Sequence, residues 1–175
     1  MTAKLPAQYA WLANEPGPKL LLEALKLFGT LEVQGDGNCP EILSWAKECG
    51  LEGVYKADSI PWCGLFAAVI VKRAGKPVVK DPLWAANWLK FGEACEPELG
   101  AIAVFSRDGG NHVCLIVGED ATHYHCLGGN QKDSVCITRI SKDRLRGCRA
   151  LYNTKPANVR KVLLSSVGEV STNEQ

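Results

Sequence analysis

The pattern of apolar residues changes at Gly100, and this change constrains the fold more than any other feature of the chain. Before Gly100, apolar residues recur three and four positions apart, which is typical of amphipathic helices. After it, short β-branched runs alternate with turn residues, which is typical of strands. The expected helices are 18–28, 38–50, 61–75 and 82–92, and the expected strands are 100–106, 112–118, 123–127, 135–140 and 148–152. Helices followed by an antiparallel meander predict an α+β fold.

Length and composition favour a single folded domain. The chain has 175 residues, of which 46% are apolar and 22% are charged, and these values exclude disorder. The net charge of +1 makes nucleic acid an unexpected partner. The longest apolar run ends at Lys72, well short of the ~18 residues that a membrane span needs. We predict one domain over 1–155 and a partly flexible tail over 156–175, with a short helix at 159–164 and frayed residues from Ser171.

The first residues carry no secretory signal pattern. Met1 to Lys4 lead into Pro6 and Gln8 without an apolar segment. We therefore expect synthesis in the cytoplasm.

Eight cysteines are many for a chain of this length, and one of them differs from the rest. No two are spaced as Cys-x-x-Cys, and seven mostly lie in apolar segments, so we interpret those seven as buried thiols. Cys63 instead follows helix-start residues, among them Asp58 and Pro61. The free N–H groups and the positive dipole at a helix N-terminus stabilise a thiolate, so Cys63 is a candidate nucleophile.

Two later segments complete a candidate catalytic set. His112 opens a strand after a glycine-rich turn, where a general base can be held rigidly and still reach a substrate. The run Gly128-Gly129-Asn130-Gln131 follows a strand expected to pair with that of His112. A side chain from this run could orient the imidazole. The alternative for each is structural: a buried cysteine, a hairpin histidine and a glycine turn.

Four segments together resemble the papain-like peptidoglycan hydrolases of the CHAP and NlpC-type group. Residues 58–66 resemble the nucleophile helix of that group, and 100–105 resemble its first sheet strand. Residues 111–118 resemble its histidine strand. Leu127 to Gln131, followed by Val135, is similar to a phage and prophage subgroup that carries the run LGGNQ. The similarity covers about residues 35–152.

This resemblance implies a papain-like fold and a thiol mechanism without metal or cofactor. It makes Cys63 the nucleophile, His112 the base and Asn130 the third member, with Gln131 and Asp58 near the site. Gly128 stands where many CHAP domains have Glu, and Ala101 replaces the usual strand Asp. NlpC-type enzymes use a second histidine, so His125 is the alternative third member. The second oxyanion donor stays open among residues upstream of the nucleophile, which include Tyr55, Asp58 and Ser59.

The implied activity is cleavage of an amide bond in the stem peptide of bacterial peptidoglycan. We expect a monomer that acts on the cell wall after release, either as a phage endolysin or as a secreted antibacterial effector with an immunity protein as partner. Which amide bond is cut stays open.

Two other interpretations of the sequence remain. One is a zinc site, since zinc could bind the side chains of His123, His125, Cys114 and Cys126. Strand alternation, however, points His123 and His125 to the face opposite that of Cys126. A non-catalytic wall-binding or phage structural module could keep the same fold, with tryptophans stacked on sugars. We expect Trp45, Trp62, Trp84 and Trp88 to lie in the core instead.

Overall fold

The computed structural model describes residues 3–174 and confirms the α+β layout. The described residues form a six-stranded antiparallel sheet with the order β1-β6-β2-β3-β4-β5. Strands β2 to β5 form a meander, after which β6 crosses over to pair with β2. The strand bounds are β1 Glu93–Ala94, β2 Ile102–Arg107, β3 Gly110–Glu119, β4 His123–Gln131, β5 Ser134–Ser141 and β6 Leu145–Ala150.

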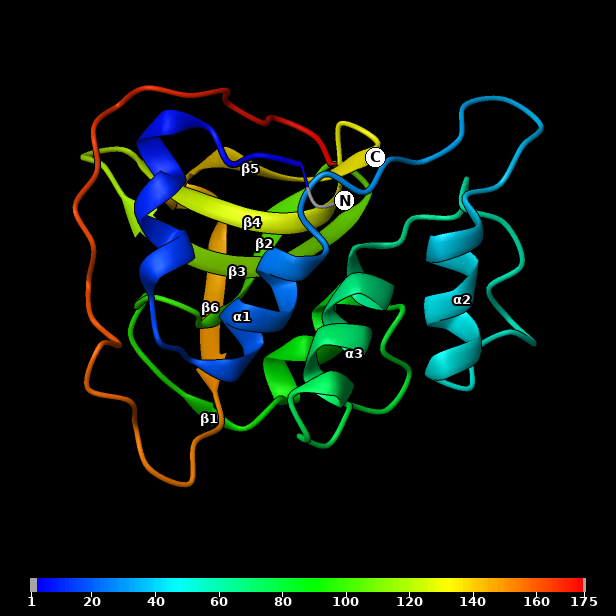
Figure 1. Ribbon diagram of the computed structural model, residues 1–175, viewed down its shortest axis with the longest axis horizontal. Coiled ribbons are helices and arrows are strands. Elements are labelled where there is room, and N and C mark those ends of the chain that lie inside the picture. The colour runs from blue at the N-terminus through cyan, green and yellow to red at the C-terminus, as the bar shows by residue number, and fades with distance from the viewer. Residues whose placement is uncertain (1–2, 175) are drawn as a thin grey trace.

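Helix α3 is the central helix of the N-terminal half. Every one of its residues from Cys63 to Val71 is buried, because the sheet lies on one side of it and α1 and α2 pack on others. In Figure 1, α1 lies in front of the sheet and α2 lies beyond α3. The helix bounds are α1 Lys19–Lys26, α2 Pro40–Glu48 and α3 Cys63–Arg73, with 3₁₀ helices at Ala7–Asn14, Ala85–Lys90 and Lys142–Arg144.

Both faces of the sheet are buried. The face toward the helices carries alternate apolar residues of the strands, including Val104, Val113 and Leu127, and joins the main core. The other face forms a second, smaller cluster around Phe105 and Cys114. The sheet is curled, and β6 crosses β3 and β4 steeply (Figure 1).

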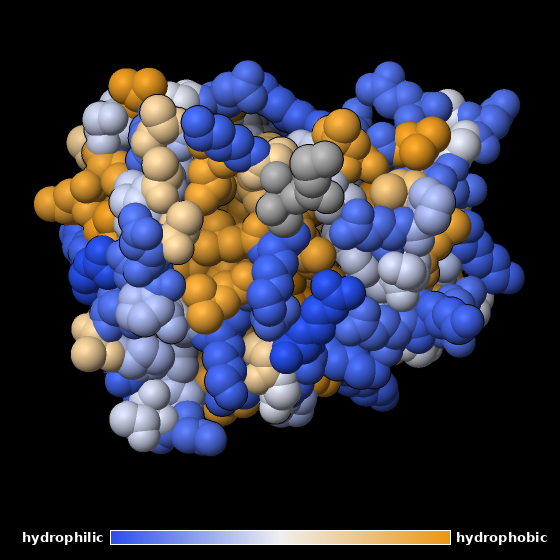
Figure 2. Space-filling model, in the orientation of Figure 1, coloured by the Kyte–Doolittle hydropathy of each residue, from blue (hydrophilic) through white to orange (hydrophobic). Residues whose placement is uncertain are grey.

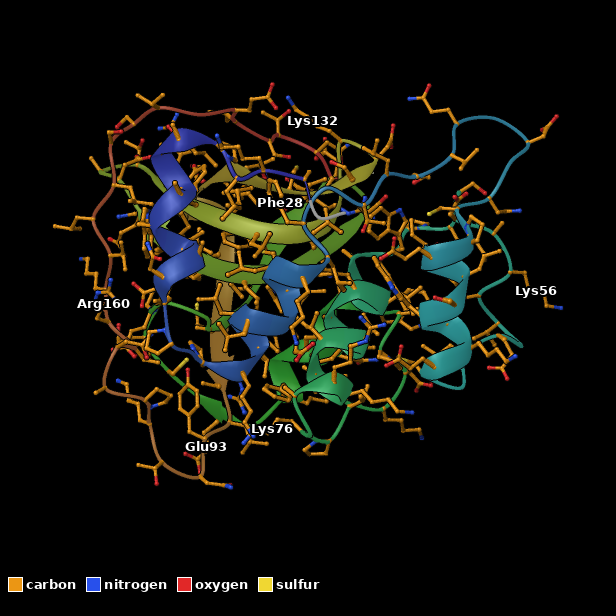
Figure 3. All side chains as sticks on the ribbon, in the orientation of Figure 1. Phe28, Lys56, Lys76, Glu93, Lys132 and Arg160 are labelled. Atoms are coloured by element: carbon orange, nitrogen blue, oxygen red, sulfur yellow. The ribbon has the colours of Figure 1, made fainter. Side chains whose placement is uncertain are left out.

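Charged residues surround this core. The surface over α2 is mainly hydrophilic, whereas apolar residues show between the first 3₁₀ helix and α3 (Figure 2). Lys56 and Arg160 lie on opposite sides of the view, one beyond α2 and one on the C-terminal segment (Figure 3). None of the helices within residues 3–174 has the length and apolar character that a membrane-crossing helix needs.

The C-terminal segment is extended, so the short helix predicted at 159–164 is wrong. Backbone hydrogen bonds join Glu119 to Val162 and Leu164, and join Arg139 to Glu169 and Ser171. The segment therefore runs along the sheet and satisfies its own backbone groups there. In Figure 1 it passes around the outside of the molecule in orange and red. Near the end of this segment, Glu174 is buried and forms an ion pair with Arg144. Residues 171–174 are therefore held against the fold, whereas the sequence predicted that they fray.

Three local features differ from the sequence expectation. Helix α3 begins at Cys63 rather than near Pro61, which makes the cysteine its first residue. Trp84 is 74% exposed, so its expected place in the core is wrong; it precedes the 3₁₀ helix whose Trp88 is buried. Strand β4 continues through 128–131, and the turn is formed instead by Lys132 and Asp133, both with positive φ as in a type I′ hairpin.

Two glycines in β4 lie in close contacts that leave no room for a side chain, and one of them, Gly129, faces α3. A β-carbon on Gly129 would lie 2.7 Å from Phe66 Cβ and from the ring of Trp62. One on Gly128 would lie 2.7 Å from the Gln131 side chain and 2.9 Å from Cys114 Cβ. The absence of a side chain at Gly129 lets the first turn of α3 lie directly on β4, which sets the position of Cys63.

We predict that Gly129→Ala destabilises the protein by about 1–3 kcal/mol, because the added methyl group overpacks the contact with Trp62 and Phe66. Urea denaturation followed by tryptophan fluorescence measures the change. Gly53→Ala is the matched control, since its β-carbon would meet nothing within 4 Å. Equal stability of the two variants would contradict the close-packing argument.

Candidate active site

Cys63 occupies the N-terminal end of α3. It is the first residue of the helix, follows Trp62 at the cap position, and is 4% exposed. No side chain caps this helix end. The unpaired N–H groups and the dipole of the first turn therefore act on the thiol.

His112 lies on β3, opposite Phe105 of β2, and is fully buried. Its Nε2 donates a hydrogen bond to Oε1 of Gln131, at 2.9 Å. Its Nδ1 is buried and has no hydrogen-bond partner within residues 3–174. The imidazole is thus anchored through one nitrogen and leaves the other for proton exchange.

The orientation of Gln131 is set by its own contacts. Its amide nitrogen donates to the carbonyl oxygens of Cys126, at 3.1 Å, and of Cys136, at 2.7 Å. The NH₂ group is therefore committed to two backbone acceptors, and the amide oxygen must face His112. This arrangement places a proton on Nε2 of the imidazole and leaves the lone pair on Nδ1.

The thiol of Cys63 and the imidazole of His112 shift each other toward the ion pair. Burial raises the pKa of Cys63, but the interaction with His112, the Val113 N–H and the charge of Arg107 outweigh burial and lower it. Burial lowers the pKa of His112, and its interactions with the thiols of Cys114 and Cys63 outweigh burial and raise it. Both directions favour a thiolate beside an imidazolium, which is the reactive form of a cysteine nucleophile.

Asn130, expected to orient His112, does not make that hydrogen bond; Gln131 makes it. The β4–β5 register shifts between Gly128 and Gln131, and Asn130 adopts a φ of 57° at this bulge. A bulge adds one residue to the strand, so simple alternation fails there. The Asn130 side chain is buried, and its Nδ2 has no hydrogen-bond partner in the described part of the chain.

His125, the alternative third member, lies elsewhere in the sheet. It pairs with Gly118, six residues along β3 from His112, or about 20 Å in an extended strand. Its Nε2 donates to Asp120 at 2.9 Å, and its Nδ1 accepts from the Tyr9 hydroxyl at 2.6 Å. Burial lowers the pKa of His125 despite the Asp120 carboxylate. This buried network ties the N-terminal segment to the sheet and is separate from Cys63.

Asp58 stabilises the loop before α3 through hydrogen bonds. Its Oδ2 accepts hydrogen bonds from the backbone N–H groups of Val33, at 3.1 Å, and of Cys39, at 2.5 Å. The carboxylate therefore joins the segment before α2 to the segment before α3. Of the other upstream residues, Tyr55 is buried and Ser59 is exposed.

A pocket of about 390 Å³ opens beside the nucleophile. Both exposed Trp84 and Arg107 of the β2–β3 hairpin line it. The lining residues are Ile60, Pro61, Cys63, Leu83, Trp84, Ala85, Ala86, Arg107, Gly109, Gly110 and Asn111. Although Cys63 is nearly buried, its pocket gives a small molecule or chain a route to the thiol.

The four residues named for a zinc site do not form a metal-binding group in the described part of the chain. Among residues 3–174, no group of three or more His, Cys, Asp or Glu side chains is placed to hold a metal ion. All eight cysteines are free thiols, four of them buried and four partly buried.

Comparisons with family models, curated proteins and solved structures found no match to this chain. Any functional conclusion therefore depends on the site geometry and on the sequence motifs.

We predict that Cys63 is the most readily alkylated thiol of the native protein at pH 6.5. Its pKa is lowered, so the thiolate persists as the pH falls, whereas the pKa of five other thiols is raised, to about 11 for Cys49. Brief iodoacetamide treatment and peptide mapping measure the labelling. Labelling spread over other cysteines with Cys63 spared would contradict the prediction.

We further predict that Gln131→Ala lowers the rate of Cys63 alkylation at pH 6.5 about tenfold. A hydrogen bond from a charged imidazolium is stronger than one from a neutral ring, so its loss disfavours the ion pair and raises the pKa of Cys63. A pH profile of the alkylation rate measures this shift. His125→Ala is the control and should leave the profile unchanged. An equal shift of the pH profile in both variants would show that Gln131 does not position His112.

Proposed function

We propose that this protein is a papain-like cysteine hydrolase that cleaves an amide bond of the peptidoglycan stem peptide. The observation that carries the proposal is the position of Cys63 at a helix N-terminus beside a pocket, where His112 lowers the pKa of the thiol and is itself hydrogen-bonded to Gln131. A thiol, an imidazole and an orienting amide are the components of the Cys-His-Asn arrangement, here with Gln in the third place.

The reaction then follows from the positions of these groups. The Cys63 thiolate attacks the carbonyl carbon, and the negative charge moves to the carbonyl oxygen, near the free N–H groups of the α3 N-terminus. The proton on His112 Nδ1 passes to the leaving amine as the carbon–nitrogen bond breaks. Water, deprotonated by Nδ1, then attacks the thioester, releases the carboxylic acid and restores the thiol. Throughout, Gln131 holds the ring through Nε2.

The substrate class comes from the resemblance of 58–66, 111–118 and 127–131 to peptidoglycan hydrolases. A phage or prophage endolysin is the first biological role that this resemblance favours, with the cell wall as its site of action. A secreted antibacterial effector, which would have an immunity protein as partner, is the second. Neither role needs a metal or cofactor for the steps above.

One observation favours a wall-binding module without catalysis as a second candidate. Trp84 is exposed at the edge of the pocket, and an exposed aromatic ring can stack on a sugar. The two candidates differ in turnover, since only the hydrolase releases new amine and carboxyl ends from purified peptidoglycan.

We predict that the wild-type protein hydrolyses purified peptidoglycan and that Cys63→Ala abolishes this activity, by several orders of magnitude in rate, with the fold retained. Mass spectrometry of the released fragments measures turnover and identifies the bond that is cut. Cys49→Ala, which removes a partly buried thiol at the C-terminal cap of α2, is the control and should remain active. Activity that EDTA abolishes and zinc restores would contradict the thiol mechanism.

A further inference from the structure

The pocket beside Cys63 has two chemically different walls. One wall is apolar and comes from residues 60–61 and 83–86, with Trp84 at its edge. The other comes from the β2–β3 hairpin and carries the guanidinium of Arg107. A ligand that fills this pocket therefore meets both apolar side chains and a positive charge.

Arg107 is held by its hairpin without a counter-ion. Its Nε donates to the Asn111 carbonyl at 3.2 Å, and its Nη1 donates to the Asp108 carbonyl at 3.1 Å. No carboxylate of residues 3–174 lies within ion-pair distance of the guanidinium. Two backbone acceptors fix the plane of the group while its charge remains unneutralised.

A second arginine extends this positive region. Arg146 donates from Nη1 to the Asn111 side-chain oxygen at 2.8 Å, and it too pairs with no carboxylate in the described chain. Asn111 thus joins the two guanidinium groups, one at its carbonyl and one at its side chain. By contrast, four arginines form ion pairs with Glu or Asp: Arg73, Arg139, Arg144 and Arg160.

We propose that Arg107 is the binding site for a carboxylate of the substrate, so that the protein selects acyl peptides carrying a carboxylate close to the scissile amide. The inference rests on the proposed function for the reaction but not for the anion site itself. A guanidinium group is planar, and once two backbone carbonyls have fixed its orientation, its remaining N–H groups can donate to a carboxylate. Arg146, which is joined to the hairpin through Asn111, adds to the positive charge, and the apolar residues beside Trp84 receive the apolar part of the peptide.

The effect of Arg107 on the nucleophile supports this placement. Its charge is one of the influences that lower the pKa of Cys63. A carboxylate bound to Arg107 would therefore sit near the thiol, within the same pocket.

Alkylation of Cys63 by two reagents of equal size tests the site without using peptidoglycan. Iodoacetate carries a carboxylate and iodoacetamide does not, so the ratio of their rates reports anion binding and cancels changes in thiolate population. We expect Arg107→Gln to lower this ratio about tenfold, and Arg107→Lys, which keeps the charge without the planar group, to lower it less. Arg149→Gln is the control, because Arg149 donates to the carbonyls of Phe91 and Gly92, outside the pocket. Thermal melts check the folding of each variant.

A competition experiment separates a binding site from a long-range field. N-acetylglycine should slow the alkylation of wild-type Cys63 by iodoacetamide in a saturable way, and N-acetylglycinamide should not. An unchanged rate ratio in Arg107→Gln, or equal protection by the two competitors, would overturn the proposal. If the ratio depends on Arg107 but peptidoglycan is not cleaved, the hydrolase assignment fails and the anion site stands. If peptidoglycan is cleaved but the rate ratio is unchanged in Arg107→Gln, the hydrolase assignment stands and the anion site fails.

Discussion

The close approach of α3 to β4 is the contact on which the rest of the site depends. Gly129 leaves room for the Trp62 ring and for Phe66, so the first turn of α3 lies directly on the strand. Any side chain at this position would push the helix away from the sheet, and Cys63 would move with it. The distance between the nucleophile and the base is thus controlled by a residue that takes no part in the chemistry.

The second constraint is the buried amide of Gln131. In an apolar interior, each polar atom needs a hydrogen-bond partner. The Gln131 side chain has three such partners: two backbone carbonyls and the imidazole of His112. The two carbonyls decide which way the amide points, and the amide then decides which nitrogen of the imidazole carries the proton. The protonation state at the reacting end of His112 is therefore set by backbone groups of β4 and β5 on the far side of the ring.

The pocket adds an electrostatic asymmetry to this arrangement. The charged wall around Arg107 comes from a hairpin in the second half of the chain, and the apolar wall comes from segments that flank α3. The same charge lowers the pKa of Cys63 and stands unneutralised toward the pocket. Activation of the nucleophile and selection of an anionic ligand would then share one guanidinium group.

The sequence by itself determined the α+β class, the helix that carries Cys63 and the strand that carries His112, because periodicity and turn residues act locally. It also indicated that the segment 128–131 lies beside the strand of His112. Only the tertiary structure decided that Gln131, not Asn130, contacts His112, since the bulge at Asn130 changes which side chains share a face. Likewise, the extended C-terminal segment and the exposure of Trp84 depend on contacts between residues distant in sequence. Propensity describes a segment alone, whereas register, bulges and pocket walls arise only when segments pack together.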